Sequence, residues 1–110
     1  MLVEMRTYTI KPGRVDDFLS FYERHGWALQ QQYLGTCLGW YSSKDGPLFQ
    51  VVHLWAYQDY ADRERRRDAL YRDPAWVEYF DGVSEQGLLL AAENKFLSPT
   101  GFSPVPALPA

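Results

Sequence analysis

Side chains that bind anions or transfer protons alternate along the first strand-like segment of the chain. Within residues 2–10, Glu4, Arg6 and Tyr8 occupy one alternating set of positions and therefore share one strand face. An arginine between a carboxylate and a phenol is suited to orienting an anionic or carbonyl-bearing ligand. The alternative is a structural ion pair in which Arg6 satisfies Glu4 or Glu93, with Tyr8 packed beside it.

A histidine occupies the middle of another strand-like segment. His53 shares its predicted strand face with Trp55 and Tyr57. An imidazole ordinarily titrates near neutral pH, so in an aromatic cavity it is suited to general-base chemistry. We therefore take His53 and Tyr8 as candidate catalytic residues, and Trp55 and Tyr57 as candidate ligand contacts. The alternative is a hydrogen-bonded core histidine that holds the sheet or a dimer together.

Two arginines lie one helical turn apart in the predicted helix 59–71. Arg63 and Arg67 both fall on the helix side that is expected to meet the sheet. An inward pair of guanidinium groups is suited to binding a carboxylate or phosphate. Arg63, with Arg6 and Glu4, completes the candidate ligand-binding set. The alternative is that these arginines pair with acidic side chains of the chain itself, at Glu4, Asp62 or Glu93.

The sequence argues against a metal site. Its two histidines, His25 and His53, lie on different predicted elements, and Cys37 is its one cysteine. These residues form no metal-ligand motif, and a haem would have to use a single histidine as its axial ligand. The chain also carries no glycine-rich phosphate loop and no serine-nucleophile motif. We therefore expect no metal and no cofactor.

Composition excludes several classes of protein. The chain has 110 residues, a net charge of −3 and a pI near 5.2, which argues against nucleic-acid binding and against docking on anionic membranes. Its longest apolar run, residues 88–92, is too short for a membrane span. A single cysteine and the absence of a signal-peptide pattern fit the reducing cytoplasm. We expect one cytoplasmic domain with no nucleic-acid partner and no membrane span.

The order of predicted elements indicates a fold class. Hydrophobic periodicity and turn signals predict strands at 2–10, 36–43, 48–57 and 88–97. They also predict three helices, at 14–33 with a kink at Gly26, at 59–71, and from residue 73 to an end between residues 82 and 87. This β-α-β-β-α-β order is typical of an α+β ferredoxin-like sandwich with a four-stranded antiparallel sheet. We expect a domain at 1–97 and an extended proline-rich tail at 98–110, either loose or lying on a partner.

Aromatic residues exceed what one small core is expected to hide. The chain has 4 Trp, 8 Tyr and 6 Phe, or 16% of its residues. Such residues are enriched in interfaces and ligand cavities. Both faces of the first predicted strand also mix apolar and polar side chains, which suggests that the sheet is covered on both sides. We therefore expect a homodimer that packs sheet against sheet.

Five separated blocks of the chain resemble the NIPSNAP family of the dimeric α/β-barrel superfamily. The blocks are residues 4–13, 46–57, 61–67, 73–76 and 93–97, in that order. The resemblance implies a ferredoxin-like subunit that dimerises through its sheet. The wider superfamily includes cofactor-independent monooxygenases, isomerases or lyases, and haem proteins.

Two functions remain open at this point. The first is a protein that binds or transforms a small aromatic or isoprenoid-like molecule without a metal. The second is a non-catalytic dimeric interaction or structural module. The first requires that Arg6, Tyr8, His53 and Arg63 converge on one region, because a one-residue slip in strand register would send His53 to the opposite face of the sheet.

Overall fold

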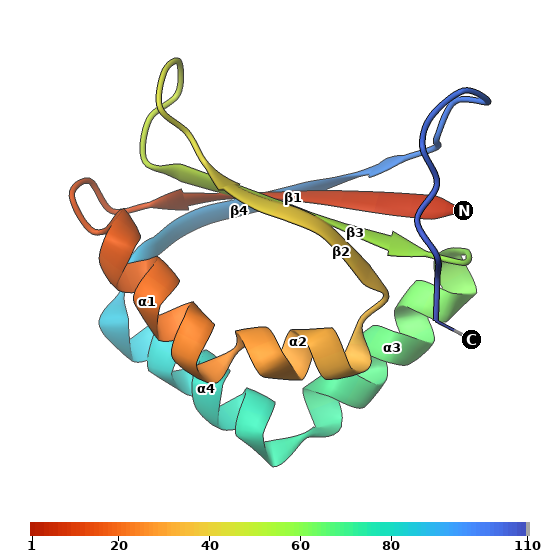
Figure 1. The fold of residues 1–110 in the computed structure, drawn as a ribbon. Coiled ribbons are helices and arrows are strands. Elements are labelled where there is room, and N and C mark those ends of the chain that lie inside the picture. The colour runs from red at the N-terminus through yellow and green to blue at the C-terminus, as the bar shows by residue number, and fades with distance from the viewer. Residues whose placement is uncertain (110) are drawn as a thin grey trace.

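The computed structural model describes residues 1–109. Four strands and four helices follow one another along the chain (Figure 1): β1 (Leu2–Ile10), α1 (Val15–His25), α2 (Trp27–Tyr33), β2 (Thr36–Ser42), β3 (Gln50–Tyr57), α3 (Tyr60–Arg72), α4 (Pro74–Gln86) and β4 (Leu89–Leu97). All four helices lie on one side of the sheet. The fold is the predicted ferredoxin-like α+β sandwich.

The sheet is antiparallel throughout, with the strand order β2-β3-β1-β4. Strands β1 and β3 are therefore central neighbours, as the sequence predicts. Arg6 is paired with His53 on β3 and with Asn94 on β4. Because paired residues of neighbouring strands point to the same face, the register aligns these polar side chains on the helix-covered side.

The first predicted helix is broken rather than kinked at Gly26. This residue ends α1 and begins α2. A Cβ there would lie 2.9 Å from the Tyr22 ring and 3.0 Å from the Tyr79 ring, so the close packing of α1 and α4 favours glycine. The break also redirects Trp27, which the uninterrupted helix would place on its polar side. Its ring instead lies 6.1 Å from that of Trp55.

One strand begins two residues later than predicted, whereas the predicted end of the first helical segment at residue 33 agrees with the structure. Strand β3 begins at Gln50, not at Leu48, because Phe49 adopts a left-handed backbone conformation with φ of 61° and interrupts the extended run. Helix α2 ends at Tyr33 with Leu34 as its C-cap. Gly35 follows this C-cap, where a left-handed capping glycine is common, but its φ is not positive. A Cβ at Gly35 would lie 2.0 Å from the Ala56 carbonyl oxygen, so its role is close backbone packing.

Side-chain caps fix the starts of the two helices that cover the site. The Asp59 carboxylate accepts a hydrogen bond from the Asp62 amide at the start of α3. The Asp73 carboxylate accepts one from the Ala75 amide at the start of α4, where Pro74 occupies the first helical turn. The predicted helix starts are confirmed to within a residue.

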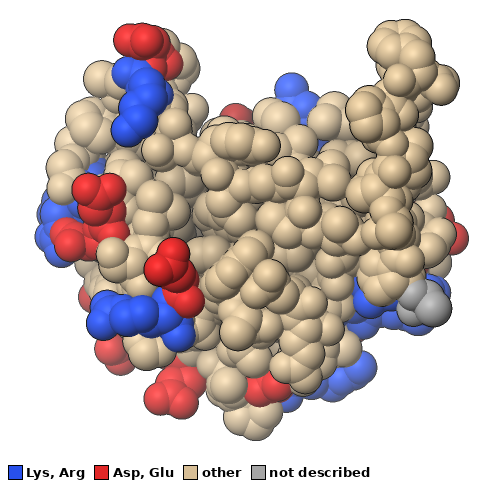
Figure 2. Space-filling model, viewed as in Figure 1, with Lys and Arg blue, Asp and Glu red and all other residues tan. Residues whose placement is uncertain are grey.

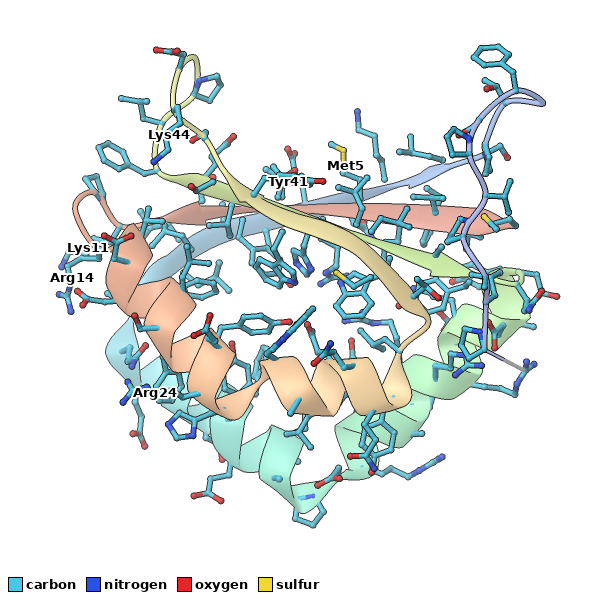
Figure 3. The ribbon with its side chains drawn as sticks, in the orientation of Figure 1. Met5, Lys11, Arg14, Arg24, Tyr41 and Lys44 are labelled. Atoms are coloured by element: carbon cyan, nitrogen blue, oxygen red, sulfur yellow. The ribbon has the colours of Figure 1, made fainter. Side chains whose placement is uncertain are left out.

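The outer face of the sheet, away from the helices, carries Met5 and Tyr41 (Figure 3). The β2–β3 hairpin and the tail both project on this side (Figure 1). The tail folds back on its own chain, since Thr36 Oγ1 donates to the Ala107 carbonyl at 3.0 Å. Phe102, at its turn, is 92% exposed. Ala110, the last residue of the predicted tail, lies outside the described residues.

Within residues 1–109, no helix combines the length and the hydropathy that a bilayer crossing requires.

Candidate functional site

A buried carboxylate lies at the centre of the polar face of β1. Glu4 is fully buried, and its Oε2 accepts hydrogen bonds from Arg6 Nη1 at 2.9 Å, Arg63 Nη2 at 2.8 Å and Asn94 Nδ2 at 2.8 Å. Arg63 Nε also donates to Oε1 at 3.2 Å, so this arginine binds the carboxylate through two nitrogens. Arg67 Nη1 lies 3.8 Å from Oε1. One carboxylate thus joins two strands and α3.

This network keeps Glu4 ionised. Burial by itself raises the pKa of the carboxyl group, but hydrogen bonds from Arg63 and Asn94, with the charges of Arg6 and Arg67, outweigh it and lower the pKa to about 2. Glu93, an alternative partner considered from the sequence, is exposed and is paired with Thr7 in the sheet. Asn94 carries no signal in the sequence, because its contact with Glu4 depends on the β1–β4 register.

Arg6, Tyr8 and His53 come together on the same face. Arg6 Nε donates a hydrogen bond to the Tyr8 hydroxyl at 3.0 Å. The Tyr8 ring meets the His53 ring edge-on, with centroids 5.0 Å apart. On its other side, His53 stacks on Trp40 with centroids 3.8 Å apart. Three of the four residues expected to converge therefore lie together, and Arg63 is joined to Arg6 only through Glu4. The one-residue slip in strand register does not occur.

His53 is enclosed by aromatic rings and is fully buried. Its Nδ1 accepts a hydrogen bond from Trp55 Nε1 at 2.9 Å, which places the ring proton of the neutral form on Nε2. Burial, reinforced by the charges of Arg6 and Arg67, lowers the pKa of His53 to about 3. At neutral pH the imidazole is therefore uncharged. Among the described residues, Nε2 has no hydrogen-bond partner.

Two neighbouring hollows lie between this strand face and the helices. They have volumes of about 400 Å³ and 110 Å³. We call them together the interior cavity, because the same five residues line both: Arg6, Tyr8, Gln30, Trp76 and Phe80. The larger hollow also reaches Arg67 and Tyr71, and the smaller one reaches Trp40 and Tyr79. The interior cavity thus combines aromatic walls with one cationic end.

The predicted site residues take different positions relative to this cavity. Arg6 and Tyr8 line it. Arg63 instead binds Glu4 and Glu64, away from the cavity lining. Trp55 and Tyr57 are fully buried and lie outside the lining of both hollows.

Arg67 is the cationic residue of α3 that lines the cavity. Its spacing of four residues from Arg63 was the sequence signal for it, but spacing alone does not decide which of the two arginines reaches a cavity. The structure separates them, because Arg63 pairs with Glu4 and Glu64, whereas Arg67 donates to the Tyr71 hydroxyl and lines the cavity.

A second, larger hollow lies between α1, α2 and the edge strand β2. It has a volume of about 760 Å³ and is lined by residues that include Trp27, Trp40, Trp55 and Cys37, with Glu23 as its acidic member. The face of the molecule in Figure 2 is largely uncharged over β2 and α2. This hollow does not include the polar residues of β1, so the sequence-predicted site lies in the interior cavity instead.

Among residues 1–109, no three histidine, cysteine, aspartate or glutamate side chains are grouped as a metal site would require. The buried polar cluster is rich in guanidinium groups, which are not metal ligands. What the geometry offers is a cavity with aromatic walls, a phenol held by a guanidinium, and a neutral imidazole behind it.

The fold and site define a ferredoxin-like α+β domain with a polar cluster between sheet and helices. The profile of the NIPSNAP family matches residues 3–104. The chain belongs to this family. Its structure superposes with a TM-score of 0.90 on an uncharacterized NIPSNAP domain protein from Burkholderia xenovorans, at 38% identity over 96% of this chain and 100% of that one. Another NIPSNAP-like protein from the same organism has 43% identity and a TM-score of 0.89, over 94% of this chain and 89% of that one.

The curated relatives are longer proteins. A NipSnap homolog from Dictyostelium discoideum is 37% identical over 68% of this chain, and NipSnap from Drosophila melanogaster is 29% identical over 94%. The chain spans about a third of the length of these relatives, 33% and 36% respectively. A more distant likeness, to an antibiotic biosynthesis monooxygenase, has 17% identity and a TM-score of 0.60 over 91% of this chain and 99% of that one. It shows the shared ferredoxin-like fold.

Proposed function

We propose that this protein binds or transforms a small aromatic or isoprenoid-like molecule in the interior cavity, without a metal. The observation that carries the proposal is the cavity itself, about 400 Å³ in its larger part, with Arg6 and Tyr8 on its wall. Ligand sites are characteristically concave and mostly apolar, with a few placed polar groups. Trp76 and Phe80 supply flat apolar walls, and Phe80 is half exposed at the opening.

Tyr8 is the candidate proton donor of this site. Its hydroxyl accepts a hydrogen bond from Arg6, so the phenolic proton remains free to point toward a ligand oxygen. His53 lies behind Tyr8 rather than on the cavity wall, with Trp55 on its Nδ1. We assign His53 the role of fixing the Tyr8 and Trp40 rings. An enzyme of this design acts by orientation and proton transfer alone.

The competing function is a non-catalytic interaction module. The Glu4 network is the one observation that supports it. The network joins β1, β4 and α3 through groups that satisfy one another, which is what a structural role requires. The aromatic residues that line the interior cavity are not needed for that role. Half-exposed Phe80 and Val77 at its opening favour a site that a ligand enters.

We also propose that the protein is a homodimer that packs through the outer face of the sheet. Val52 and Leu54 on β3 and Met5 on β1 lie on this face, opposite the side that meets the helices. The same face also carries Thr7 on β1, and Glu93 and Lys95 on the edge strand β4. A sheet-to-sheet contact would therefore bury the apolar centre and leave the charged side chains at its rim. The hairpin and the tail project from the two ends of the same face and would flank a partner placed on it.

Calorimetric titration with three probes tests the ligand proposal. Naphthalen-2-ol represents an aromatic ligand, farnesol an isoprenoid-like one, and glucose a polar control. We expect saturable binding of at least one of the first two, and no binding of glucose. The Ala92→Phe variant places a ring in the smaller part of the cavity, which Ala92 lines, and is expected to weaken that binding at least ~10-fold.

Ala28→Phe is the matched control, because Ala28 is an exposed residue on α2 outside the interior cavity. It is expected to leave probe binding unchanged. If neither apolar probe binds at millimolar concentration, or if both variants bind as the unmodified protein does, the proposed ligand site is wrong.

A further inference from the structure

The charges beside the interior cavity do not balance. The guanidinium groups of Arg6, Arg63 and Arg67 surround the single buried carboxylate of Glu4. Glu64, at the surface, pairs with Arg63. Three guanidinium groups against two carboxylates leave one positive charge. Buried charges are normally paired, so this excess calls for an anion that the chain does not itself supply.

Arg67 carries the excess. It is 4% exposed, and its Nη1 is a buried nitrogen with no hydrogen-bond partner among the described residues. Its Nε donates to the Tyr71 hydroxyl at 2.9 Å, which fixes the plane of the guanidinium. The distance of 3.8 Å from Nη1 to Glu4 Oε1 is too long for a hydrogen bond. The Arg67 guanidinium also lies near the buried Tyr57 hydroxyl and holds the pKa of that phenol below the value that burial alone would give. A neutral phenol does not offset the charge of Arg67, so the excess positive charge still calls for an anion.

The positive end faces the cavity. Both Arg6 and Arg67 line the larger hollow, as does Tyr8, whose hydroxyl accepts a hydrogen bond from Arg6. Asp81 also lines this hollow, but it is exposed, so water screens its charge at the mouth. Glu4 does not neutralise the inner end, because its single negative charge faces three guanidinium groups.

We propose that the ligand of the interior cavity is an aromatic or apolar carboxylate whose anionic end binds between Arg6 and Arg67. This inference rests on the proposed function and adds the charge of the ligand to it. A single excess positive charge matches a carboxylate, which carries one negative charge, better than a phosphate dianion. Planar guanidinium groups also match the geometry of a carboxylate. The apolar body of the ligand then lies against Trp76 and Phe80.

Two probes of the same shape test this inference on the unmodified protein. Naphthalene-2-carboxylate and naphthalene-2-carboxamide differ in charge at pH 7 but scarcely in size. Calorimetric titration is expected to show that the carboxylate binds at least ~10-fold more tightly, because a charge-assisted hydrogen bond replaces a neutral one. Inorganic phosphate, the third probe, is expected to bind weakly, because it has no apolar body to fill the cavity.

Variants of Arg67 identify the group responsible. Arg67→Met keeps the apolar stem and is expected to weaken carboxylate binding ~10-fold and carboxamide binding by much less, because the carboxamide loses only a neutral hydrogen bond. Arg67→Lys is expected to retain part of the preference for the carboxylate. Arg72→Met, an exposed arginine later on the same helix, is the matched control and is expected to change neither affinity. The comparison of the two probes on the unmodified protein is decisive even if Arg67→Met does not fold.

Each outcome has a distinct meaning. A preference for the carboxylate that Arg67→Met removes supports the inference. Equal binding of carboxylate and carboxamide overturns it while leaving the proposed apolar site in place. Tight phosphate binding overturns the carboxylate assignment. Failure of both naphthalene probes to bind overturns the inference together with the function on which it rests.

Discussion

Glu4 is the residue on which the polar cluster depends. One of its oxygens accepts hydrogen bonds from Arg6, Arg63 and Asn94, and the carboxyl group is fully buried. Removing one partner of a buried ion pair leaves the other charge uncompensated, which is more costly than never having had the pair. The stability of the site therefore depends on this carboxylate more than on any one arginine.

We predict that Glu4→Gln lowers the free energy of unfolding by about 3 kcal/mol or more. The amide keeps the shape of the side chain but removes the negative charge that three guanidinium groups surround. Urea denaturation followed by far-ultraviolet circular dichroism measures the loss. Glu85→Gln on α4 is the control and is expected to cost within about 0.5 kcal/mol, because Glu85 is exposed and lies away from the polar cluster and from the outer sheet face. Equal effects of the two substitutions would contradict the assignment.

His53 and Glu4 give stability a pH dependence in two separate windows. The pKa of His53 is lowered from 6.5 to about 3, so its contribution is complete above pH 6.5 and is lost as the pH falls toward 3. The pKa of Glu4 is lowered from 4.5 to about 2, so its contribution is lost only below pH 4.5. Between pH 6.5 and 4.5, only His53 of these two residues changes the free energy of unfolding with pH.

We predict that His53→Gln flattens the pH dependence of stability between pH 6.5 and 4.5. The unmodified protein is expected to lose about 2–3 kcal/mol over this interval through His53, because the unfolded chain binds a proton that the folded chain does not. Urea denaturation at half-unit pH steps measures the slope. His25→Gln, at an exposed position on α1, is the control and should leave the slope unchanged. An unaltered slope in the His53 variant would show that this imidazole already takes up its proton normally in the folded state.

At the scale of elements, the join between α2 and β2 holds the edge strand in place. Gly35 follows the C-cap of α2 and lies against the backbone of β3. Its φ is not in the left-handed region, so the requirement for glycine here is space and not backbone conformation. Strand β2 also carries Trp40, which stacks on His53. A displacement of β2 at its start would therefore move Trp40 and disturb its stacking on His53.

We predict that Gly35→Ala costs about 2 kcal/mol or more of stability, because its Cβ would lie 2.0 Å from the Ala56 carbonyl oxygen and would push β2 from β3. Thermal and urea denaturation measure the cost. Gly101→Ala is the matched control, since a Cβ at Gly101 meets no atom within 4 Å. A Gly35→Ala variant as stable as the Gly101→Ala variant would contradict this description of the join.

Most helices and strands could be predicted from the sequence, because their ends are marked by local sequence signals. Asp59 and the Asp73-Pro74 pair mark the starts of α3 and α4, and Gly26 marks the break that became two helices. The exceptions are positions where tertiary packing decides. Gly35 resembles a helix-capping glycine, and Phe49 adopts a conformation that no local signal indicates.

The candidate site could be predicted only in part, because tertiary packing decides some of its contacts. Strand alternation places Glu4, Arg6 and Tyr8 on one face, and the predicted order of strands brings β3 beside them. The rotation of α3 about its axis decides which of its arginines reaches the cavity. The register of β4 against β1 decides that Asn94 reaches Glu4. No pattern within one segment encodes those two quantities.

At the scale of the whole molecule, the two faces of the sheet have different surroundings. One face is covered by four helices and carries the polar cluster. The other carries Met5 and Tyr41, and Tyr41 is 59% exposed. The proposed homodimer would cover this outer face without touching the interior cavity, so ligand binding and dimerisation are separable in experiments.

We predict that Leu54→Glu converts a dimer into a monomer. A buried carboxylate in the middle of an apolar sheet-to-sheet contact would lack a partner and would weaken association strongly. Light scattering coupled to gel filtration is expected to report about twice the chain mass of 12.8 kDa for the unmodified protein, and the chain mass for the variant. Val77→Glu, on the exposed side of α4, is the control and should leave the dimer intact. A monomeric unmodified protein at micromolar concentration would refute the dimer proposal.

The most direct test of the ligand-binding claim uses the indole signals of the four tryptophans in a ¹⁵N-labelled sample titrated with naphthalen-2-ol. Trp76 lines the interior cavity, whereas Trp27 lines the separate hollow beside β2. We predict a saturable shift of the Trp76 indole signal that Ala92→Phe suppresses, with the Trp27 signal unchanged. A saturable shift of Trp27 alone would place the ligand in the other hollow, and no shift of either signal at saturating probe would contradict the interior site altogether.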